Sequence, residues 1–276
     1  MKIFEKCERL DNVARAKEWG LYPYFHVLNT KQDTRVEMEG RDILMIGSNN
    51  YLGLTSDERV IRAGVEALEK YGSGCSGSRF LNGTLETHVA LEKELAAFLR
   101  KEDAVTFSTG FQSNLGIISA VAGRTDTVLC DKENHASIYD GCRLSFAKMV
   151  RYNHSDMEDL ERKLASLDLS AGGALIVTDG VFSMSGEICR LPEIVRIAKK
   201  YGAGVMVDDA HGLGVLGEGG RGTASHFGLE DEVDIYMGTF SKSLASLGGY
   251  MAANKKICEY VRHVSRPFIF SASITP

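Results

Sequence analysis

Two apolar stretches in the second half of the chain each lead into side chains that could do chemistry. The run 204–207 ends at Asp208, with His211 three residues further on, and the run 235–238 comes shortly before Lys242. A lysine amine can condense with an aldehyde, and a carboxylate can keep a pyridine nitrogen protonated, so that the ring absorbs electrons from a carbanion. This pattern predicts chemistry on pyridoxal 5'-phosphate (PLP), with Lys242 joined to the cofactor aldehyde and Asp208 facing the ring nitrogen.

The surroundings of these residues favour that interpretation over two simpler ones. Most lysines are solvated surface residues, but Lys242 has small or apolar neighbours, which we expect to desolvate its amine and lower its pKa. Asp208 and His211 could bind a metal together with His135, or could be structural. Beside Lys242, a hydrogen bond from His211 to the cofactor's phenolic oxygen is the better interpretation, and no metal site is predicted.

Two other segments follow predicted strands and could contact the same cofactor. His135 is a lone histidine of the kind that is most often structural, although at a strand's carboxyl end its flat imidazole could stack on a cofactor ring. The segment 108–114 contains Gly110 and opens a helical stretch. Free backbone N–H groups at a helix N-terminus suit a phosphate, although a plain strand-to-helix turn would have the same pattern.

The segment 212–217 matches the pattern Gly-x-Gly-x-x-Gly, which would suggest a dinucleotide site. The charged residues 208–211 separate these glycines from the preceding strand, and the segment 218–222 is too rich in glycine to begin a stable helix. A nicotinamide cofactor is therefore disfavoured, and we expect a glycine-rich loop.

Strand and helix patterns alternate along most of the chain, which predicts an α/β fold with a doubly wound, mostly parallel sheet. Ligands bind beyond the carboxyl ends of such strands, so we expect Ser108, Asp208 and Thr239 to converge there. Residues 1–45 are predicted to form an N-terminal arm outside the main sheet. The predicted strands are Ile43–Gly47, Ala104–Ser108, Thr127–Asp131, Ala174–Thr178, Gly204–Asp208, Ile235–Gly238 and Gly249–Ala252.

Three helices have clear signals. The stretch 85–99 is predicted to begin after an N-cap at Thr84. Pro192 in the first turn and Gly202 at the end delimit a second helix from Leu191 to Tyr201, and a third is predicted from Met157 to Leu167. The residues of the first helix expected to share its apolar face are Leu91, Leu95, Phe98 and Leu99.

Composition narrows the class of protein. Of the 276 residues, 44% are hydrophobic and 25% charged, and the net charge is −5 without a basic block, which argues against nucleic acid as the main partner. The six cysteines form no Cys-x-x-Cys pair, which favours a reducing cytoplasm over a disulfide framework. The N-terminus lacks the apolar core of a signal peptide, and no apolar stretch approaches the roughly 20 residues of a membrane span.

Ordered motifs along nearly the whole chain carry a family resemblance; they occupy residues 49–54, 74–80, 108–111, 134–137, 179–184, 208–212 and 239–242. Together they resemble the α-oxoamine synthases, which are fold-type I PLP enzymes. Within that family, the segments 47–51, 78–84 and 239–249 are most similar to the soluble bacterial serine palmitoyltransferases. Ser241 precedes the lysine where other branches more often have glycine.

The resemblance implies a role for each matching residue. It implies that Lys242 is the covalent attachment point, that Asp208 faces the pyridinium and that His135 stacks on the ring. The remaining implied contacts are Ser183 and His211 with the phenolic oxygen, Gly110, Phe111 and Thr239 with the phosphate, and Asn49 and Ser78 with the substrate. The segment 270–273, with Ser273, resembles one that reaches the neighbouring subunit's phosphate site, which implies a homodimer with shared active sites.

The activity implied by the resemblance is a decarboxylating condensation of L-serine with a long-chain acyl-CoA, palmitoyl-CoA, to give 3-ketodihydrosphingosine, CoA and CO2. Another α-oxoamine synthase activity, such as that of 8-amino-7-oxononanoate synthase or 2-amino-3-ketobutyrate CoA ligase, is the alternative. A non-enzyme alternative is an inactive fragment or partner subunit. Peripheral membrane contact is expected with a lipid product, and acyl chain length is not set by these motifs.

The resemblance also predicts the domain organisation. Residues 46–276 would form the PLP-binding large domain behind the N-terminal arm. The family has a further small C-terminal domain with an arginine that binds the substrate carboxylate, and we expect that domain to be absent from this chain, which stops before it.

Overall fold

The computed structural model describes residues 1–276, which form two compact units, Met1–Gly47 and Ser48–Pro276. In the first unit, Glu39 and Gly40 have positive φ angles, and this turn joins two short antiparallel strands. The predicted strand Ile43–Gly47 is therefore wrong, because the local hairpin ends at Leu44 and is separate from the main sheet. The elements of this unit are η1 (Lys2–Glu8), α1 (Asp11–Glu18), β1 (Arg35–Met38) and β2 (Arg41–Leu44).

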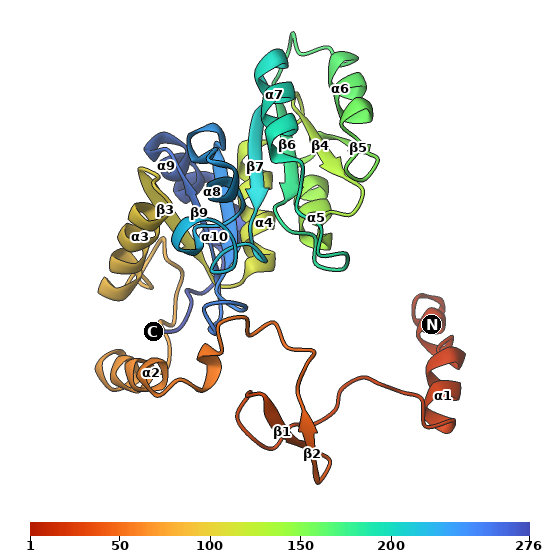
Figure 1. Ribbon diagram of the computed structural model, residues 1–276, viewed down its shortest axis with the longest axis vertical. Coiled ribbons are helices and arrows are strands. Elements are labelled where there is room, and N and C mark those ends of the chain that lie inside the picture. The colour runs from red at the N-terminus through yellow and green to blue at the C-terminus, as the bar shows by residue number, and fades with distance from the viewer. The chain divides into compact units, whose positions relative to one another are not determined.

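A seven-stranded sheet forms the centre of the second unit, in the order β3-β9-β8-β7-β6-β4-β5 (Figure 1). Only β9 runs antiparallel to its neighbours, so the predicted doubly wound, mostly parallel sheet is confirmed. The strands are β3 (Asp103–Phe107), β4 (Thr127–Asp131), β5 (Lys148–Tyr152), β6 (Ala174–Asp179), β7 (Gly204–Asp208), β8 (Ile235–Thr239) and β9 (Gly249–Ala253).

The central strands are apolar throughout because both faces of the sheet are buried. In β7, Val205 and Val207 join the core on one face, while Met206 between them joins the core on the other. The edge strand β5 is different: its burial is partial and it carries charged residues, which explains why no strand was predicted there.

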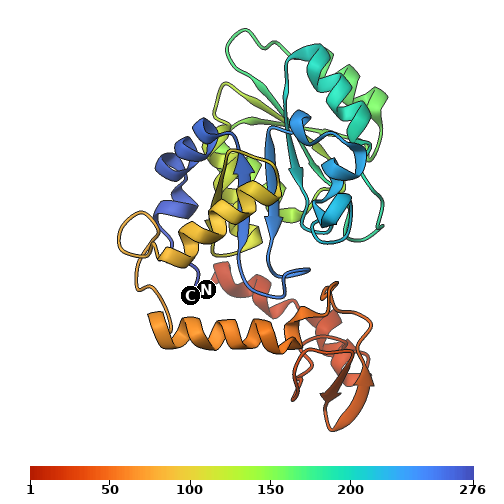
Figure 2. The same cartoon turned by 60° about the vertical axis from the view of Figure 1, so that its left-hand side comes forward.

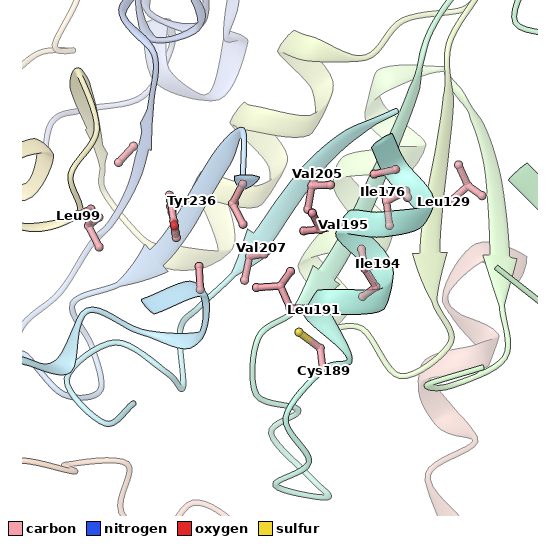
Figure 3. Close-up of a cluster of buried hydrophobic side chains, with 14 of the residues drawn as sticks. Leu99, Leu129, Ile176, Cys189, Leu191, Ile194, Val195, Val205, Val207 and Tyr236 are labelled. Carbon is pink, nitrogen blue, oxygen red and sulfur yellow. The ribbon is translucent and has the colours of Figure 1, made fainter. Parts of the chain in front are cut away.

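Helices cover both faces of the sheet (Figures 1 and 2). One core lies under the first group of helices, where Leu191, Ile194 and Val195 of α7 face residues of β6 and β7 (Figure 3). This group comprises α3 (Glu86–Phe98), α6 (Met157–Ala165), α7 (Leu191–Tyr201) and α8 (Thr223–Phe227). The second group comprises α4 (Gly110–Val121), α5 (Ala136–Ser145), α9 (Lys255–Val264) and α10 (Arg266–Ile269).

The other elements of the second unit contribute less to these cores. The helix α2 (Glu58–Tyr71) has no buried residue, and it begins at an N-cap, Asp57, whose carboxylate accepts a hydrogen bond from the amide of Arg59. None of the helices in the chain is both long enough and apolar enough to cross a membrane. Three short 3-10 helices complete the unit: η2 (Leu54–Ser56), η3 (Glu218–Gly220) and η4 (Glu230–Glu232).

The helix α3 is present as predicted, but its orientation differs. Leu95 and Leu99 are buried, whereas Phe98 is 41% exposed and Glu92 lies on the buried face. The N-cap position is Leu85, and the hydroxyl of Thr84 instead donates to the backbone carbonyl of Arg79, so both the predicted cap and part of the predicted apolar face are wrong.

A buried ion pair accounts for this rotation of α3. The Glu92 carboxylate accepts hydrogen bonds from Arg79 Nη1 and Nη2 at 2.8 and 3.1 Å, and each of the two side chains is only 7% exposed. The same carboxylate accepts from the backbone N–H of Thr106 in β3 at 2.8 Å. The pair therefore fixes α3 against β3 and holds the loop around Arg79 in place.

Glu92→Ala should destabilise the protein strongly, because it leaves the Arg79 guanidinium buried without its carboxylate. We expect the free energy of unfolding in urea to fall by about 3–5 kcal/mol. Glu94→Ala, at an exposed position of the same helix, is the matched control, with an expected change of ~0.5 kcal/mol or less. Equal effects of the two substitutions would contradict the structural importance of the pair.

Candidate active site

Polar side chains gather where parallel strands of the sheet end. The strands β6, β7 and β8 end at Asp179, Asp208 and Thr239, and the helix α4 begins beside them. Together with the loop after β8, these elements enclose a cavity of about 240 Å³. The residues that line it and have a role below are Thr109, Gly110, Phe111, Asn114, His135, Asp179, Ser183, Asp208, His211, Thr239 and Lys242.

The amine of Lys242 points into this cavity from the loop after β8. Its Nζ lies 2.7 Å from His211 Nε2. Burial of the amine lowers its pKa from the ordinary lysine value, and the nearby carboxylates of Asp208 and Asp179 offset part of that effect. A lysine in this state loses its proton more readily and becomes a better nucleophile and base.

His211 lies between the lysine and an aromatic hydroxyl. Its Nδ1 is 2.6 Å from Tyr51 Oη. Burial lowers the pKa of the ring to about 4, with smaller contributions in the same direction from Lys242 and His135. The imidazole is therefore neutral at physiological pH and carries hydrogen on only one nitrogen.

Two acidic side chains lie next to each other at the end of the sheet. Asp208 is 3% exposed, and its carboxylate accepts hydrogen bonds from Asn114 Nδ2 at 2.7 Å and from the amide of Ala210 at 3.1 Å. Asp179, the last residue of β6, lies beside Asp208, the last residue of β7, in the parallel register of the two strands. Burial and the neighbouring Asp208 raise the pKa of Asp179 well above its ordinary value.

The start of α4 forms the opposite wall of the cavity. The side chain of Thr109 caps the helix by accepting from the amide of Gln112 at 3.1 Å, and the amides of Gly110 and Phe111 precede it in the first turn, where no intrahelical acceptor exists. A Cβ at Gly110 would lie 2.8 Å from Thr239 Oγ1, so only glycine allows this close approach. The result is a small concave surface with open N–H donors, as an anion requires.

His135 and Ser183 complete the cavity. The ring of His135 lies edge-to-face with Phe111, with centroids 6.3 Å apart, and its backbone N–H donates to Asp179 Oδ2 at 2.8 Å. Ser183 lies at the tip of a hairpin that is closed by a bridge between Val181 and Ile188, and its side chain is exposed toward the cavity.

Eight of the predicted site residues line this cavity: Gly110, Phe111, His135, Ser183, Asp208, His211, Thr239 and Lys242. The other three, Asn49, Ser78 and Ser273, lie outside its lining. Ser273 is held by its own chain, because its amide and hydroxyl donate to the carbonyls of Gly77 and Gly83. The predicted convergence of Ser108 is wrong, since its hydroxyl donates to the carbonyl of Ala272 and Thr109 takes its place.

Sequence patterns did not assign Asn114, Asp179 or Tyr51 to the site. The position of Asp179 at the carboxyl end of a predicted strand was the available signal, equal to that of Asp208. Asn114 and Tyr51 lie in the segments 108–114 and 49–54, but nothing local indicated their partners, which are 94 and 160 residues away in the chain.

The glycine-rich loop 212–217 has a different role from a dinucleotide site. The carboxylate of Asp209 is buried beneath it and accepts from the amide and hydroxyl of Thr223 at 2.7 and 2.6 Å. A Cβ at Gly212 or Gly222 would collide with that carboxylate. Burial raises the pKa of Asp209 to about 6. These two glycines therefore allow close packing around a buried acid.

The donor set of the cavity fits an aldehyde-bearing pyridine phosphate. The amine of Lys242, with its lowered pKa, suits the aldehyde, and the buried carboxylate of Asp208 suits the ring nitrogen. The open amides at the start of α4 suit the phosphate. No group of three or more His, Cys, Asp or Glu side chains in the chain is arranged to hold a metal ion.

Comparison with known proteins identifies the family. Residues 41–276 match the family model of class I and II aminotransferases. The chain is 56% identical over 275 residues to a serine palmitoyltransferase of Sphingobacterium spiritivorum, covering 100% of this chain and 69% of that protein. It is 46% identical over 274 residues to an 8-amino-7-oxononanoate synthase of Thermoanaerobacter pseudethanolicus, covering 99% of this chain and 68% of that protein.

Similarity to a solved structure supports the same family assignment. A serine palmitoyltransferase from S. paucimobilis with bound PLP and myriocin is 42% identical and has a TM-score of 0.95, covering 100% of this chain and 69% of that one. The chain therefore belongs to the class I and II aminotransferase family and, within it, to the α-oxoamine synthases.

Proposed function

We propose that the protein is a PLP-dependent acyltransferase that condenses L-serine with palmitoyl-CoA, with loss of CO2 and CoA, to give 3-ketodihydrosphingosine. The observation that carries this proposal is the convergence of Lys242, His211 and Asp208 on one cavity. The relatives described above include serine palmitoyltransferases with 56% identity, and one was solved with PLP.

Lys242 and Asp208 would perform the central chemistry. When bound, PLP supplies a ring that absorbs the electron pair left behind by a proton removed from the amino acid's α-carbon. Lys242 would be the attachment point and then the base that takes this proton at Nζ, because burial already favours its neutral form. Asp208 would hold a proton on the ring nitrogen through its buried carboxylate.

The remaining cavity residues would orient the cofactor. The amides of Gly110 and Phe111 and the Thr239 hydroxyl would bind the phosphate, in agreement with the open first turn of α4. His135 would stack on the ring, and Ser183 would bond the phenolic oxygen together with His211. For the substrate we propose Asn49 and Ser78; the buried Ser78 hydroxyl has no hydrogen-bond partner in the chain.

We also propose that the protein acts as a homodimer with shared active sites. Ser273 does not line the cavity of its own chain, although the resemblance assigns it to a phosphate site. Its segment is anchored to the loop that contains Gly77 and Gly83, and Phe270 beside it is 76% exposed. An anchored segment next to an exposed aromatic side chain is suited to contact a second subunit.

Lys242→Ala should abolish covalent attachment of PLP. The wild-type protein is expected to show the visible band, roughly at 420 nm, of PLP joined to a lysine, and the variant to lack it because no other amine lines the cavity. Lys256→Ala, at an exposed position of α9, is the control and should keep the band. A Lys242→Ala protein that keeps the band and turns over would overturn the assignment.

Turnover with a panel of substrates tests the choice between related activities. Serine, glycine and alanine would each be combined with palmitoyl-CoA and with shorter acyl thioesters, and CoA release measured. Serine with palmitoyl-CoA should give the highest kcat/KM. A clear preference for alanine with a shorter thioester would favour the 8-amino-7-oxononanoate synthase activity, which the 46% identity to that enzyme keeps as a second candidate.

The shared-site proposal predicts a dimer by sedimentation velocity and a PLP affinity that depends on Ser273. Ser273→Ala should weaken PLP binding by ~10-fold, as for loss of one hydrogen bond to a charged group. Ser271→Ala, two residues away, is the matched control. A monomer that binds PLP with unchanged affinity in Ser273→Ala would contradict shared sites.

A further inference from the structure

Three side chains from distant parts of the second unit form a continuous row of hydrogen bonds that leads from the cavity to the surface of the unit. Lys242 Nζ is 2.7 Å from His211 Nε2, and His211 Nδ1 is 2.6 Å from Tyr51 Oη. The Tyr51 hydroxyl also donates to Asn49 Oδ1 at 3.4 Å, and the tyrosine is 42% exposed. One end of the row is thus a partly buried amine, and the other end is in contact with solvent.

The direction of these hydrogen bonds follows from the chemistry of each group. A protonated Lys242 has only donors, so His211 Nε2 must accept from it. The neutral ring then carries its single hydrogen on Nδ1, which donates to Tyr51 Oη, and the tyrosine hydroxyl donates onward to Asn49. In this arrangement each link of the row has one donor and one acceptor.

The row can also run in the opposite direction. A neutral Lys242 amine has a lone pair and accepts from His211 Nε2–H, and Nδ1 then accepts from the Tyr51 hydroxyl. Three transfers connect the two arrangements: Lys242 gives a proton to Nε2, Nδ1 gives its proton to the tyrosine oxygen, and the tyrosine hydroxyl gives its proton to water. The lysine loses one proton, the solvent gains one, and the histidine and tyrosine end neutral.

We propose that Tyr51 is a positioning residue for Lys242, which couples the tautomer of His211 to the protonation of the lysine amine and lets that amine exchange its proton with solvent. The inference rests on the proposed function only in taking Lys242 as the reacting amine. A lysine amine must lose its proton before it can attack the cofactor aldehyde, and the row offers that proton a path to solvent before PLP occupies the cavity.

The charged groups around the row support both end states. Asp208 and Asp179 face Lys242 and favour its ammonium form against the effect of burial. Burial keeps the ring of His211 neutral, and Lys242 and His135, which face it, act in the same direction. Burial raises the pKa of Tyr51, so this hydroxyl is retained at neutral pH and takes part as a donor and acceptor.

Nuclear magnetic resonance of the cofactor-free protein tests the coupling directly. With 15N-labelled histidine, the ring nitrogens of His211, assigned by comparison with His211→Asn, would be followed from pH 6 to pH 11. In the wild type, hydrogen should move from Nδ1 to Nε2 as Lys242 loses its proton. Tyr51→Phe should displace the pH midpoint of this shift, because Nδ1 loses the hydroxyl that accepts from it in one state and donates to it in the other, whereas Tyr260→Phe, at an exposed position of α9, should leave the midpoint unchanged.

A second measurement separates a relay from a structural role. On mixing with PLP at pH 7–8, Tyr51→Phe should form the visible band at least ~10-fold more slowly than the wild type or Tyr260→Phe, with an unchanged urea midpoint. An identical tautomer titration in Tyr51→Phe and wild type would overturn the relay. A protein that takes up no PLP would overturn the proposed function alone, because the resonance experiment needs no cofactor.

Discussion

The carboxylate of Asp208, buried at the end of the central strand β7, is the constraint around which the site is built. A buried charge is tolerated only when it is hydrogen-bonded, and Asn114 from α4 and the amide of Ala210 supply those bonds. The acid therefore fixes the start of α4 against the sheet. The same helix start presents its open amides to the cavity, so the acid and the anion-binding surface are positioned by one interaction.

Desolvation is the second feature that the site residues share. Desolvation has the largest effect on the pKa of each of three side chains. It lowers the pKa of Lys242 and of His211, and it raises the pKa of Asp179. All three changes favour the neutral form of the group. A neutral amine is the form that can attack an aldehyde or accept a proton, so the burial of Lys242 also accounts for its expected reactivity.

The structure also shows that residues of one sequence motif can have separate roles. The motif 49–54 was expected to place Asn49 at the substrate, and its Tyr51 hydrogen-bonds His211. The pattern 212–217 was expected to be a loop rather than a dinucleotide site, and its first glycine packs on the buried acid Asp209. The residues of each motif therefore have roles that depend on what packs against them in the tertiary structure.

Periodicity and strand ends were sufficient for much of the fold. The apolar run 204–207 predicted β7 correctly, because a strand buried on both faces leaves a continuous signal. The edge strand β5 left none, since only part of its surface is covered. The orientation of α3 was also out of reach, because it depends on the ion pair of Glu92 with Arg79, two residues whose charge alone would place them on the surface.

The sequence by itself determined that Asp208 and Lys242 follow successive buried strands, because parallel strands deliver their carboxyl ends to one edge of a sheet. Only the tertiary structure decided that Asn114 supports the acid and that Tyr51 contacts His211, since these pairs are 94 and 160 residues apart. Local patterns report which face of an element is buried. The partner of a polar side chain is set by how separate elements pack, and no local pattern records it.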